Sequence, residues 1–281
     1  MKSISIKCPG KVNLFLEVTG KREDGYHLID SLFLPIDDIS DTLLISKTEK
    51  PGISISCSHP GVPCNSSNLI WKAAESFAKA TNIEPAWHFE LEKNIPVAGG
   101  MGGGSSNAAS TFMALNELNG SPLSKNKMQE LALNIGADLP FFFEMAPAII
   151  EGIGERIESV KVSQELYLLF MPFNFPVPAA WTYKNRSLDF SKSSRTSRQY
   201  LTELNQGSNP ESFNDLAEPV FKKFPITYLA CKEATKLGAY TVNISGSGPT
   251  CFALFDSPST RDEARRQINR HSLSADYLPR N

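Results

Sequence analysis

One segment near the middle of the chain restricts the possible folds and functions more than any other. Residues 96–109 read Pro-Val-Ala-Gly-Gly-Met-Gly-Gly-Gly-Ser-Ser-Asn-Ala-Ala, so five of the first nine residues are glycine. The segment follows period-two alternation at Trp87–Glu92 and precedes an Ala-rich stretch that we expect to be helical from about Ser105. Glycines let several backbone amides converge on one anion, and a helix N-terminus adds unpaired N–H groups and a positive dipole end. We therefore predict a loop that binds a triphosphate.

Two common phosphate-binding loops do not fit this segment. No Lys-Ser or Lys-Thr pair follows the glycines, as a Walker loop requires, and the glycines lack the G-x-G-x-x-G spacing of a dinucleotide fold. A flexible surface linker is the remaining alternative. The strand pattern on one side and the capped, Ala-rich helix pattern on the other favour the ligand-binding interpretation.

Composition limits the partners. The chain has 281 residues, 41% of them hydrophobic, which is enough for a substantial core, and a net charge of −2 that arises from mixed charges. No strong field attracts nucleic acid or an anionic membrane, so a small-molecule partner is expected. No run of about 18 apolar residues and no signal-peptide pattern is present, which favours a cytoplasmic protein. The five cysteines lack zinc-ligand spacing, so we expect free, mostly buried thiols.

The rest of the chain alternates between strand and helix patterns without an internal repeat, which indicates an α+β fold. The predicted strands are Ile4–Ile6, Val12–Val18, Leu43–Ser46, Ile53–Ser56, Trp87–Glu92, Ala148–Glu151, Tyr167–Met171, Tyr240–Ile244 and Thr250–Phe255. The predicted helices are Asn68–Thr81 with Asn68 as its cap, Ser105–Asn119, Lys125–Asn134, Ile226–Leu237 and Thr260–Asn269. Ser187–Arg198 is typical of an exposed connection, and a domain boundary is expected near residues 150–160.

Two charged residues lie in apolar surroundings. Lys11 opens an apolar strand pattern, where a buried charge needs a partner, although a solvated strand edge is the commoner explanation of a single lysine. Asp138 precedes three consecutive phenylalanines, which predict burial nearby, and a buried carboxylate needs a cation or several donors. By itself Asp138 fits a helix-terminal cap equally well. Together with Lys11 and a triphosphate loop it becomes a candidate base or orienting group.

Other motifs are less specific. Tyr26 and His27 follow a turn at Asp24-Gly25 and suit stacking on a base and hydrogen bonding to its edge, although a hairpin with a core tyrosine is slightly favoured. Ser245–Pro249, Ser-Gly-Ser-Gly-Pro, forms either a hairpin or a second anion-facing loop, and the hairpin is favoured. His59, His88 and His271 have no supporting partners in the sequence, so we assign them no function.

Three segments, Pro9–Leu16, Pro96–Ala109 and Ser245–Phe252, resemble in order the three motifs of the GHMP kinases. Within that superfamily, Thr19–His27, Gly102–Ala109 and Gly136–Pro140 look like the diphosphocytidyl-methylerythritol kinase branch. Gly-Gly-Gly-Ser-Ser-Asn, where other branches tend to carry Gly-Leu-Gly-Ser-Ser-Ala, is the most specific match.

The resemblance implies a two-domain α+β fold: an N-terminal domain like ribosomal protein S5, over residues 1–155, and a C-terminal ferredoxin-like sandwich, over 156–281, with the active site in the cleft between them. ATP would be held by the glycine loop, with Mg²⁺ bound mainly to the phosphates and assisted at most by a serine hydroxyl. No side chain is assigned as a metal ligand. The expected ATP-binding residues are Pro96, Val97, Ala98, Gly99, Gly100, Met101, Gly102, Gly103, Gly104, Ser105, Ser106, Asn68 and Lys93, the last two near adenine or ribose.

The resemblance also implies a reaction, the ATP-dependent phosphorylation of the C2 hydroxyl of a cytidine-diphosphate-linked methylerythritol, on the non-mevalonate route to isoprenoid precursors. Asp138 would take or orient the hydroxyl proton, and Lys11 would keep Asp138 charged and steady the transferring phosphate. The other expected substrate-binding residues are Asn13 for the erythritol part, His27 for the cytosine edge, and Tyr26 and Tyr183 for stacking on its two faces, with Trp181 as the alternative to Tyr183.

Two departures from the family pattern are visible. Pro178-Ala179 stands where the family often has Pro-Thr, and Ser-Gly-Ser-Gly at Ser245–Gly248 stands where Thr-Gly variants are common. A monomer or weak homodimer is expected. The alternatives are a GHMP kinase for another small alcohol, which would not need a cytosine clamp, and a catalytically silent nucleotide-binding protein.

Overall fold

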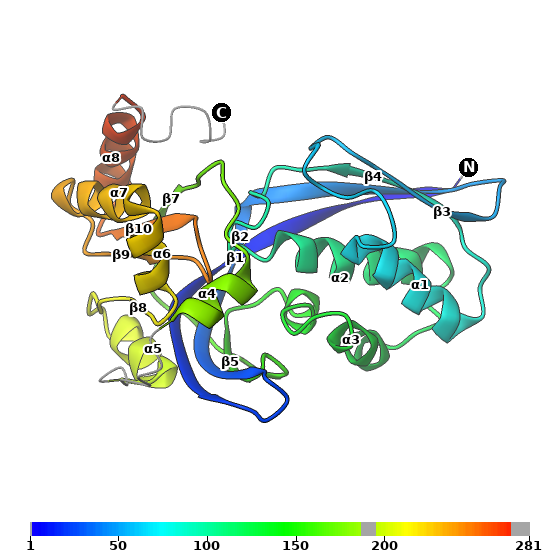
Figure 1. Ribbon diagram of the computed structural model, residues 1–281, viewed down its shortest axis with the longest axis horizontal. Coiled ribbons are helices and arrows are strands. Elements are labelled where there is room, and N and C mark those ends of the chain that lie inside the picture. Colours follow the sequence, from blue (N-terminus) through cyan, green and yellow to red (C-terminus); the bar gives the residue numbers. More distant parts are fainter. Residues whose placement is uncertain (1, 187–194, 271–281) are drawn as a thin grey trace. The chain divides into compact units, whose positions relative to one another are not determined.

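The computed structural model describes residues 2–186 and 195–270 (Figure 1). The chain forms two compact units, neither of which is a single stretch of sequence. The first unit consists of Met1–Lys11, Pro35–Val97 and Gly102–Ala146, and the second consists of Val12–Leu34, Ala98–Met101 and Pro147–Asn281. The two units are interleaved in sequence, so they do not test a division of the chain at a single residue. The expected division into residues 1–155 and 156–281 therefore remains a prediction.

Two long strands supply residues to both units. β1 runs from Ser3 to Lys21 and β2 from His27 to Lys47, and the two are neighbours in one sheet (Figure 1). The two strands predicted at Ile4–Ile6 and Val12–Val18 are parts of β1, which continues through the intervening Pro9-Gly10-Lys11. Residues 8–18 of β1 are all buried, as expected for a strand covered on both faces.

In the first unit, β2 pairs with β4 (Ala86–Glu92) in antiparallel fashion, and β4 pairs with β3 (Gly52–Cys57) in parallel. Helices α1 (Leu69–Thr81), α2 (Gly103–Leu118) and α3 (Lys125–Leu133) lie on one side of these strands (Figure 1). A 3₁₀-helix, η1 (Pro140–Phe143), packs against α2 and α3. The core between the layers is aromatic, and its fully buried members include Phe77, Trp87, Phe89 and Phe112.

The helix starts in this unit follow from their caps. The side chain of Asn68 accepts a hydrogen bond from Ile70 N and caps α1, as predicted, and Ser124 caps α3 in the same way. Helix α2 begins at Gly103, two residues before the expected start. Its cap is Gly102 in the left-handed region (φ 70°), so the last glycines of the segment belong to the helix.

The second unit contains β5 (Ala148–Gly152), which pairs with β2 and with β6 (Arg156–Ser159), and β8 (Phe213–Asn214), which pairs with β1. A separate antiparallel sheet has the order β7-β10-β9, with β7 at Tyr167–Met171, β9 at Thr241–Ile244 and β10 at Cys251–Phe255. Helices α7 (Pro225–Lys236) and α8 (Pro258–Arg270) pack against this sheet. The remaining helices are α4 (Ala179–Asn185), α5 (Ser197–Asn205) and α6 (Ala217–Lys223).

Several of these elements differ from the predictions. Helices α4, α5 and α6 were not predicted, and the end of the expected connection Ser187–Arg198 is helical, because Thr196 and Gln199 form a capping box at the start of α5. Residues 187–194 of that connection, and His271, lie outside the described residues. The five cysteines are free, and three of them are buried. In the part of the chain that the structure describes, no helix is long and apolar enough to cross a membrane.

Candidate active site

Lys11 lies in β1 within the first unit and is only 4% exposed. Its Nζ lies 3.8 Å from Oδ2 of Asp138. Burial lowers the pKa of the Lys11 ammonium, and the nearby Asp138 charge acts in the opposite direction and raises it. The alternative of a solvated lysine at a strand edge is therefore wrong, and the two residues proposed for catalysis lie together.

Asp138 lies in the turn between α3 and η1. The Asp138 carboxylate is itself only half-buried, because its side chain is 37% exposed, whereas that of Lys11 is 5% exposed. The burial predicted nearby from the phenylalanine run is confirmed at Phe141–Phe143. Asp138 is not a helix cap either, since α3 ends at Leu133 and the N-cap of η1 is Leu139. The carboxylate is thus fixed near a buried cation and still reachable by a ligand.

The glycine segment packs directly against Lys11 at Gly102. A Cβ atom at Gly102 would lie 2.8 Å from Cζ of Phe142 and 3.1 Å from Cγ of Lys11, and the residue has a φ of +70°. Both the backbone conformation and the lack of space require glycine here. Within the first unit, the end of the glycine segment, the start of the apolar strand and the turn that carries Asp138 therefore meet.

The first turn of α2 supplies the remaining part of the candidate phosphate site. The N–H groups of Gly103, Gly104 and Ser105 have no partner within the helix, as at any helix N-terminus, and the helix dipole favours an anion there. The hydroxyl of Ser106 is fully buried and has no hydrogen-bond partner among the described residues. A buried hydroxyl without a partner is unfavourable unless a ligand or an ion uses it.

Asn68 and Lys93, expected near adenine or ribose, both have protein partners. The side chain of Asn68 accepts from Ile70 N and donates to Pro63 O, so its amide serves the cap of α1. Lys93 Nζ donates to Asp41 Oδ2 at 2.7 Å and to the carbonyl of Ile95. Their contacts with nucleotide remain predictions. Asp41 was not predicted as a site residue.

In the second unit, the first half of the glycine segment contacts the Ser-Gly-Ser-Gly turn between β9 and β10. A Cβ atom at Gly100 would lie 1.9 Å from the carbonyl oxygen of Ser245, so no other residue fits at that position. The Ser245 hydroxyl donates to Gly100 O at 3.0 Å, and Thr250 N donates to Gly99 O at 3.4 Å. The favoured hairpin is confirmed, because β9 and β10 are antiparallel neighbours, and its turn supports the glycine segment.

His27 and Tyr183, both in the second unit, stack on each other with ring centroids 4.8 Å apart and an interplanar angle of 20°. Tyr26 is 58% exposed, so it is not the core tyrosine of a hairpin. Burial lowers the pKa of His27, and the positive charges of Lys21 and Arg186 lower it further. A neutral imidazole is therefore favoured.

Trp181, the alternative to Tyr183, is directed elsewhere. Its ring makes an edge contact with Phe224, at 6.2 Å between centroids, and Lys223 Nζ lies 4.3 Å from its centroid. Trp181 also packs against the hydrophobic core of the second unit. The position of Tyr183 beside His27 makes it the better candidate for contact with a base.

Asn13, expected to contact the erythritol part of the substrate, is 1% exposed and lies in the second unit. Its Nδ2 donates to Ser31 Oγ at 3.1 Å, and the Ser31 hydroxyl donates to the carbonyl of Phe15. These contacts fix the amide between β1 and β2. A contact between Asn13 and substrate remains a prediction.

A cavity of about 670 Å³ lies in the second unit, between α6, α7 and the β8 and β9 strands. Its lining includes Phe221, Tyr228 and Lys232 but none of the residues predicted for ATP or substrate binding. This cavity is therefore not the candidate site, which is described by the contacts of its own residues.

Comparison with known proteins identifies the family. Residues 68–144 match the sequence profile of the GHMP kinases N terminal domain, and residues 197–272 match that of the GHMP kinases C terminal. A curated protein from Geobacter metallireducens is 34% identical over 278 residues, which cover 99% of this chain and 97% of that protein. The chain belongs to the GHMP kinase family. The Geobacter GHMP kinase is named 4-diphosphocytidyl-2-C-methyl-D-erythritol kinase.

Solved structures of two kinases show the same fold. The crystal structure of a 4-(cytidine 5′-diphospho)-2C-methyl-D-erythritol kinase matches with a TM-score of 0.81 and 29% identity, covering 95% of this chain and 96% of that one. A homoserine kinase from Cytophaga hutchinsonii matches with a TM-score of 0.72 at 17% identity, covering 98% and 92% of the two chains, which shows the fold alone. The expected α+β, two-domain GHMP kinase fold is thereby confirmed.

Proposed function

We propose that this chain phosphorylates the C2 hydroxyl of 4-diphosphocytidyl-2-C-methyl-D-erythritol with ATP, producing the 2-phosphate and ADP. The substrate is the one in the names of the Geobacter relative and of the crystal structure at 29% identity. The reaction would form a bond between the C2 oxygen and the γ-phosphorus and break the bond between that phosphorus and the β,γ-bridging oxygen. The hydroxyl proton would pass to Asp138.

One observation supports this proposal more than any other. The buried Lys11 ammonium lies 3.8 Å from the accessible carboxylate of Asp138, and the Lys11 side chain packs against Gly102, the glycine that caps α2. A base for a hydroxyl, a fixed cation and a helix N-terminus for phosphate are the groups that phosphoryl transfer to an alcohol needs.

The roles of the pair follow from their environments. Asp138 is the acceptor, because a carboxylate that solvent and ligands reach can bind the hydroxyl and take its proton. Lys11 cannot move far from its buried strand, so its charge is preorganised to stabilise the phosphate as it is transferred. Positioning and charge supply most of the acceleration in such reactions, and the base supplies a smaller part.

Mg²⁺, which the family implies, fits the donors that are present. The partnerless Ser106 hydroxyl at the start of α2 is an oxygen donor of the kind that Mg²⁺ accepts, and no cluster of three or more acidic, His or Cys side chains was found in the described ranges. When bound, the ion would neutralise charge on the ATP phosphates. Ser106 would hold it, and the amides of Gly103, Gly104 and Ser105 would orient the phosphates.

The cytidine part of the substrate is assigned to the second unit. The stacked pair His27 and Tyr183 presents one aromatic ring and one imidazole with a lowered pKa, so the imidazole is neutral and can hydrogen bond to the cytosine edge at neutral pH. The exposed ring of Tyr26 is available for stacking on a ligand. A kinase for homoserine or mevalonate would not require this group of residues.

The test is ADP release by the purified protein with ATP, Mg²⁺ and 4-diphosphocytidyl-2-C-methyl-D-erythritol, beside homoserine, mevalonate and galactose at the same concentration. We expect turnover with the cytidyl substrate alone. A Tyr183→Ala variant should raise KM for that substrate and leave KM for ATP unchanged, with Trp181→Ala as the matched control. Turnover with another alcohol would contradict the substrate assignment, and ATP binding without turnover on any acceptor would favour a silent nucleotide-binding protein.

A further inference from the structure

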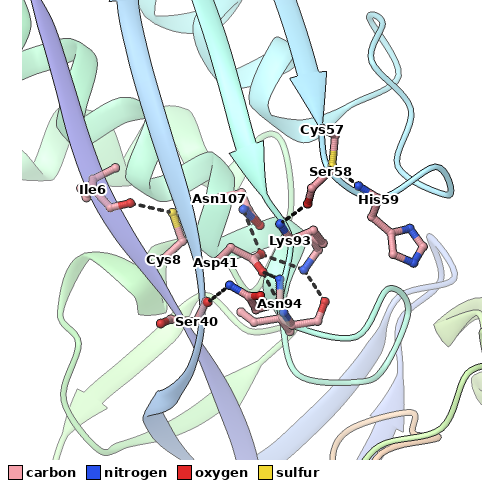
Figure 2. A network of polar contacts seen from close by, with 11 residues as sticks. Ile6, Cys8, Ser40, Asp41, Cys57, Ser58, His59, Lys93, Asn94 and Asn107 are labelled. Carbon is pink, nitrogen blue, oxygen red and sulfur yellow. Dashed lines mark hydrogen bonds and ion pairs between the residues drawn. The ribbon is translucent and has the colours of Figure 1, made fainter. Parts of the chain in front are cut away.

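A second acidic residue of the first unit, Asp41 in β2, has no exposed surface. Its two carboxylate oxygens accept four hydrogen bonds (Figure 2). Oδ1 accepts from the backbone N–H groups of Asn94 and Ile95, both at 2.8 Å. Oδ2 accepts from Lys93 Nζ at 2.7 Å and from Asn107 Nδ2 at 3.0 Å. Such a set of donors satisfies a buried carboxylate.

The four donors come from the two ends of the glycine segment. Lys93, Asn94 and Ile95 immediately precede Pro96, and Asn107 lies in α2 just after the last glycine and the two serines. Figure 2 shows the Asp41 side chain between these two groups. One carboxylate therefore joins the entry and the exit of the loop.

The packing at the start of α2 depends on the same contacts. A Cβ atom at Gly103 would lie 3.0 Å from Lys93 Nζ and 3.0 Å from Cγ2 of Ile95. The Lys93 ammonium, held by Asp41 and the Ile95 carbonyl, thus lies against the first residue of the helix whose amides would bind phosphate. Its positive charge adds to the dipole at that end of the helix.

A glycine-rich loop has many accessible conformations when its ends are not held. Each residue fixed on binding costs about 1 to 2 kcal/mol of conformational entropy, and glycine costs more than other residues. Bonds that hold both ends before the ligand arrives reduce that cost, which is how preorganisation increases affinity.

We propose that Asp41 is a positioning residue for nucleotide: by fixing Lys93 and Asn107 it preorganises the two ends of the glycine loop and thereby sets the affinity for ATP. The inference deepens the proposed function and rests on it for the identity of the nucleotide. Asp41 is not a catalytic residue, because it is fully buried and acts only through the groups it binds.

The titration behaviour of Lys93 gives a readout that a purely structural role would not change. Burial lowers the pKa of Lys93, and the charge and hydrogen bond of Asp41 in β2 raise it. The thiols of Cys57 in β3 and Cys8 in β1 also face Lys93, and they raise its pKa only where they ionise. Loss of the Asp41 charge removes the first of the raising effects. Lys93 would then lose its proton at lower pH, and nucleotide affinity would fall with rising pH earlier than in the wild type.

The experiment measures binding of AMP-PNP with Mg²⁺ by calorimetry, without acceptor, in the wild type and in Asp41→Asn. The substitution removes the charge and replaces one of the two acceptor oxygens with an NH₂ donor, so one of the two sets of donors loses its acceptor. We expect affinity to fall roughly ten- to hundredfold, the usual effect of removing a partner that orients a ligand-binding group. The double variant D41N/N107D exchanges the amide and the carboxylate across the 3.0 Å contact and should recover most of the affinity and the wild-type pH profile.

Asn116→Ala is the matched control for general destabilisation. Asn116 is a buried amide near the C-terminal end of the same helix, with hydrogen bonds to the backbone N–H and C=O of Leu123, so its loss lowers the melting temperature away from the loop. We expect no change in nucleotide affinity. Unchanged affinity in D41N, or an equal loss in N116A at equal Tm, would overturn the inference. Nucleotide binding without turnover on the cytidyl substrate would contradict only the proposed function.

Discussion

The first unit contains two lysine–aspartate pairs that differ in how exposed the carboxylate is and in how close the two charges lie. In one, Lys93 and Asp41 are 6% and 0% exposed, and their charged atoms are 2.7 Å apart. In the other, Lys11 is equally buried, but the Asp138 side chain is 37% exposed and the two charged atoms are 3.8 Å apart. The Asp41 carboxylate has four protein donors, two of them backbone amides.

This difference separates a structural use of charge from a chemical one. A carboxylate whose acceptor positions are filled by its own protein cannot bind a substrate hydroxyl, whereas one that faces solvent next to a fixed cation can. The same two residue types therefore hold the loop in one place and serve the reaction in the other. Variants of the two aspartates and the two lysines separate these roles.

The largest expected effect is on turnover when Asp138 is removed. Asp138→Ala should lower kcat by about 10² to 10⁴, the usual contribution of a positioned acid or base, and should change nucleotide affinity little. Steady-state kinetics with varied ATP and cytidyl substrate give both quantities. Near-normal turnover would show that the accessible carboxylate of Asp138 has no part in the chemistry. The two lysine–aspartate pairs would then not differ in function as described above.

The next effect is on stability when Asp41 is removed. Asp41→Ala leaves the buried Lys93 ammonium and two backbone amides without their acceptor, so the free energy of unfolding should fall by about 3 to 5 kcal/mol. Asp138→Ala should cost less than half as much, because its partly solvated carboxylate lies 3.8 Å from Lys11 and stabilises that ammonium less than Asp41 stabilises Lys93. Urea denaturation of the two variants in the same buffer measures this. Equal losses would contradict the distinction drawn between the pairs.

The sequence predicted elements with strong local signals. Helix α1 begins within a residue of its expected start, because Asn68 caps it and apolar residues recur at helical spacing. Strand β2 was predicted only at Leu43–Ser46, although it extends from His27. Pro35, Asp37 and Asp38 interrupt its alternation, and its length is set by pairing with β4 and β5, which are distant in sequence.

The two ion pairs show the same limit for the site. Lys11 and Asp138 were predicted from their apolar surroundings and from the family motifs in which they lie. Asp41 follows Asp37 and Asp38, which are exposed, and nothing local distinguishes its carboxylate from theirs. Its side-chain partners Lys93 and Asn107 are 52 and 66 residues away, so only the tertiary structure identifies it. The mutual stacking of His27 and Tyr183 is likewise a contact between distant segments.

A smaller effect on stability is expected when Lys11 is removed. Lys11→Met eliminates a buried charge and leaves a carboxylate that water reaches, so the free energy of unfolding should stay within about 1 kcal/mol of the wild type or rise. Lys93→Met leaves Asp41 buried without its cation and should be clearly destabilising. Turnover should fall in Lys11→Met although the fold is retained. Chemical denaturation with parallel activity assays tests both variants, and a strongly destabilised Lys11→Met would contradict the prediction.

The smallest effect is on the pH dependence of stability. The pKa values of both Lys11 and Lys93 are lowered by burial from the ordinary value of 10.5, and each is raised again by its carboxylate. As pH rises past the pKa in the folded state, the folded protein loses the proton while the unfolded chain keeps it until about pH 10.5. The unfolded state then binds more protons, so stability rises with pH in this window, and below it the cost of burying the charge is fully present.

Lys11→Met should remove the contribution of Lys11 to the rise in the free energy of unfolding with pH. That contribution is a few tenths of a kcal/mol per pH unit, and it cannot exceed about 1.4 kcal/mol per pH unit for one proton. The measurement is the free energy of unfolding at a series of alkaline pH values, taken as the difference between variant and wild type so that the other titrating groups cancel. Solvation of Asp138 weakens the attraction that raises the pKa of Lys11. The contribution of Lys11 to the pH dependence of stability should therefore begin at lower pH than the contribution of Lys93. An identical onset in Lys11→Met and Lys93→Met would mean that the two aspartates hold their lysines equally strongly, and the difference in exposure would then have no electrostatic consequence.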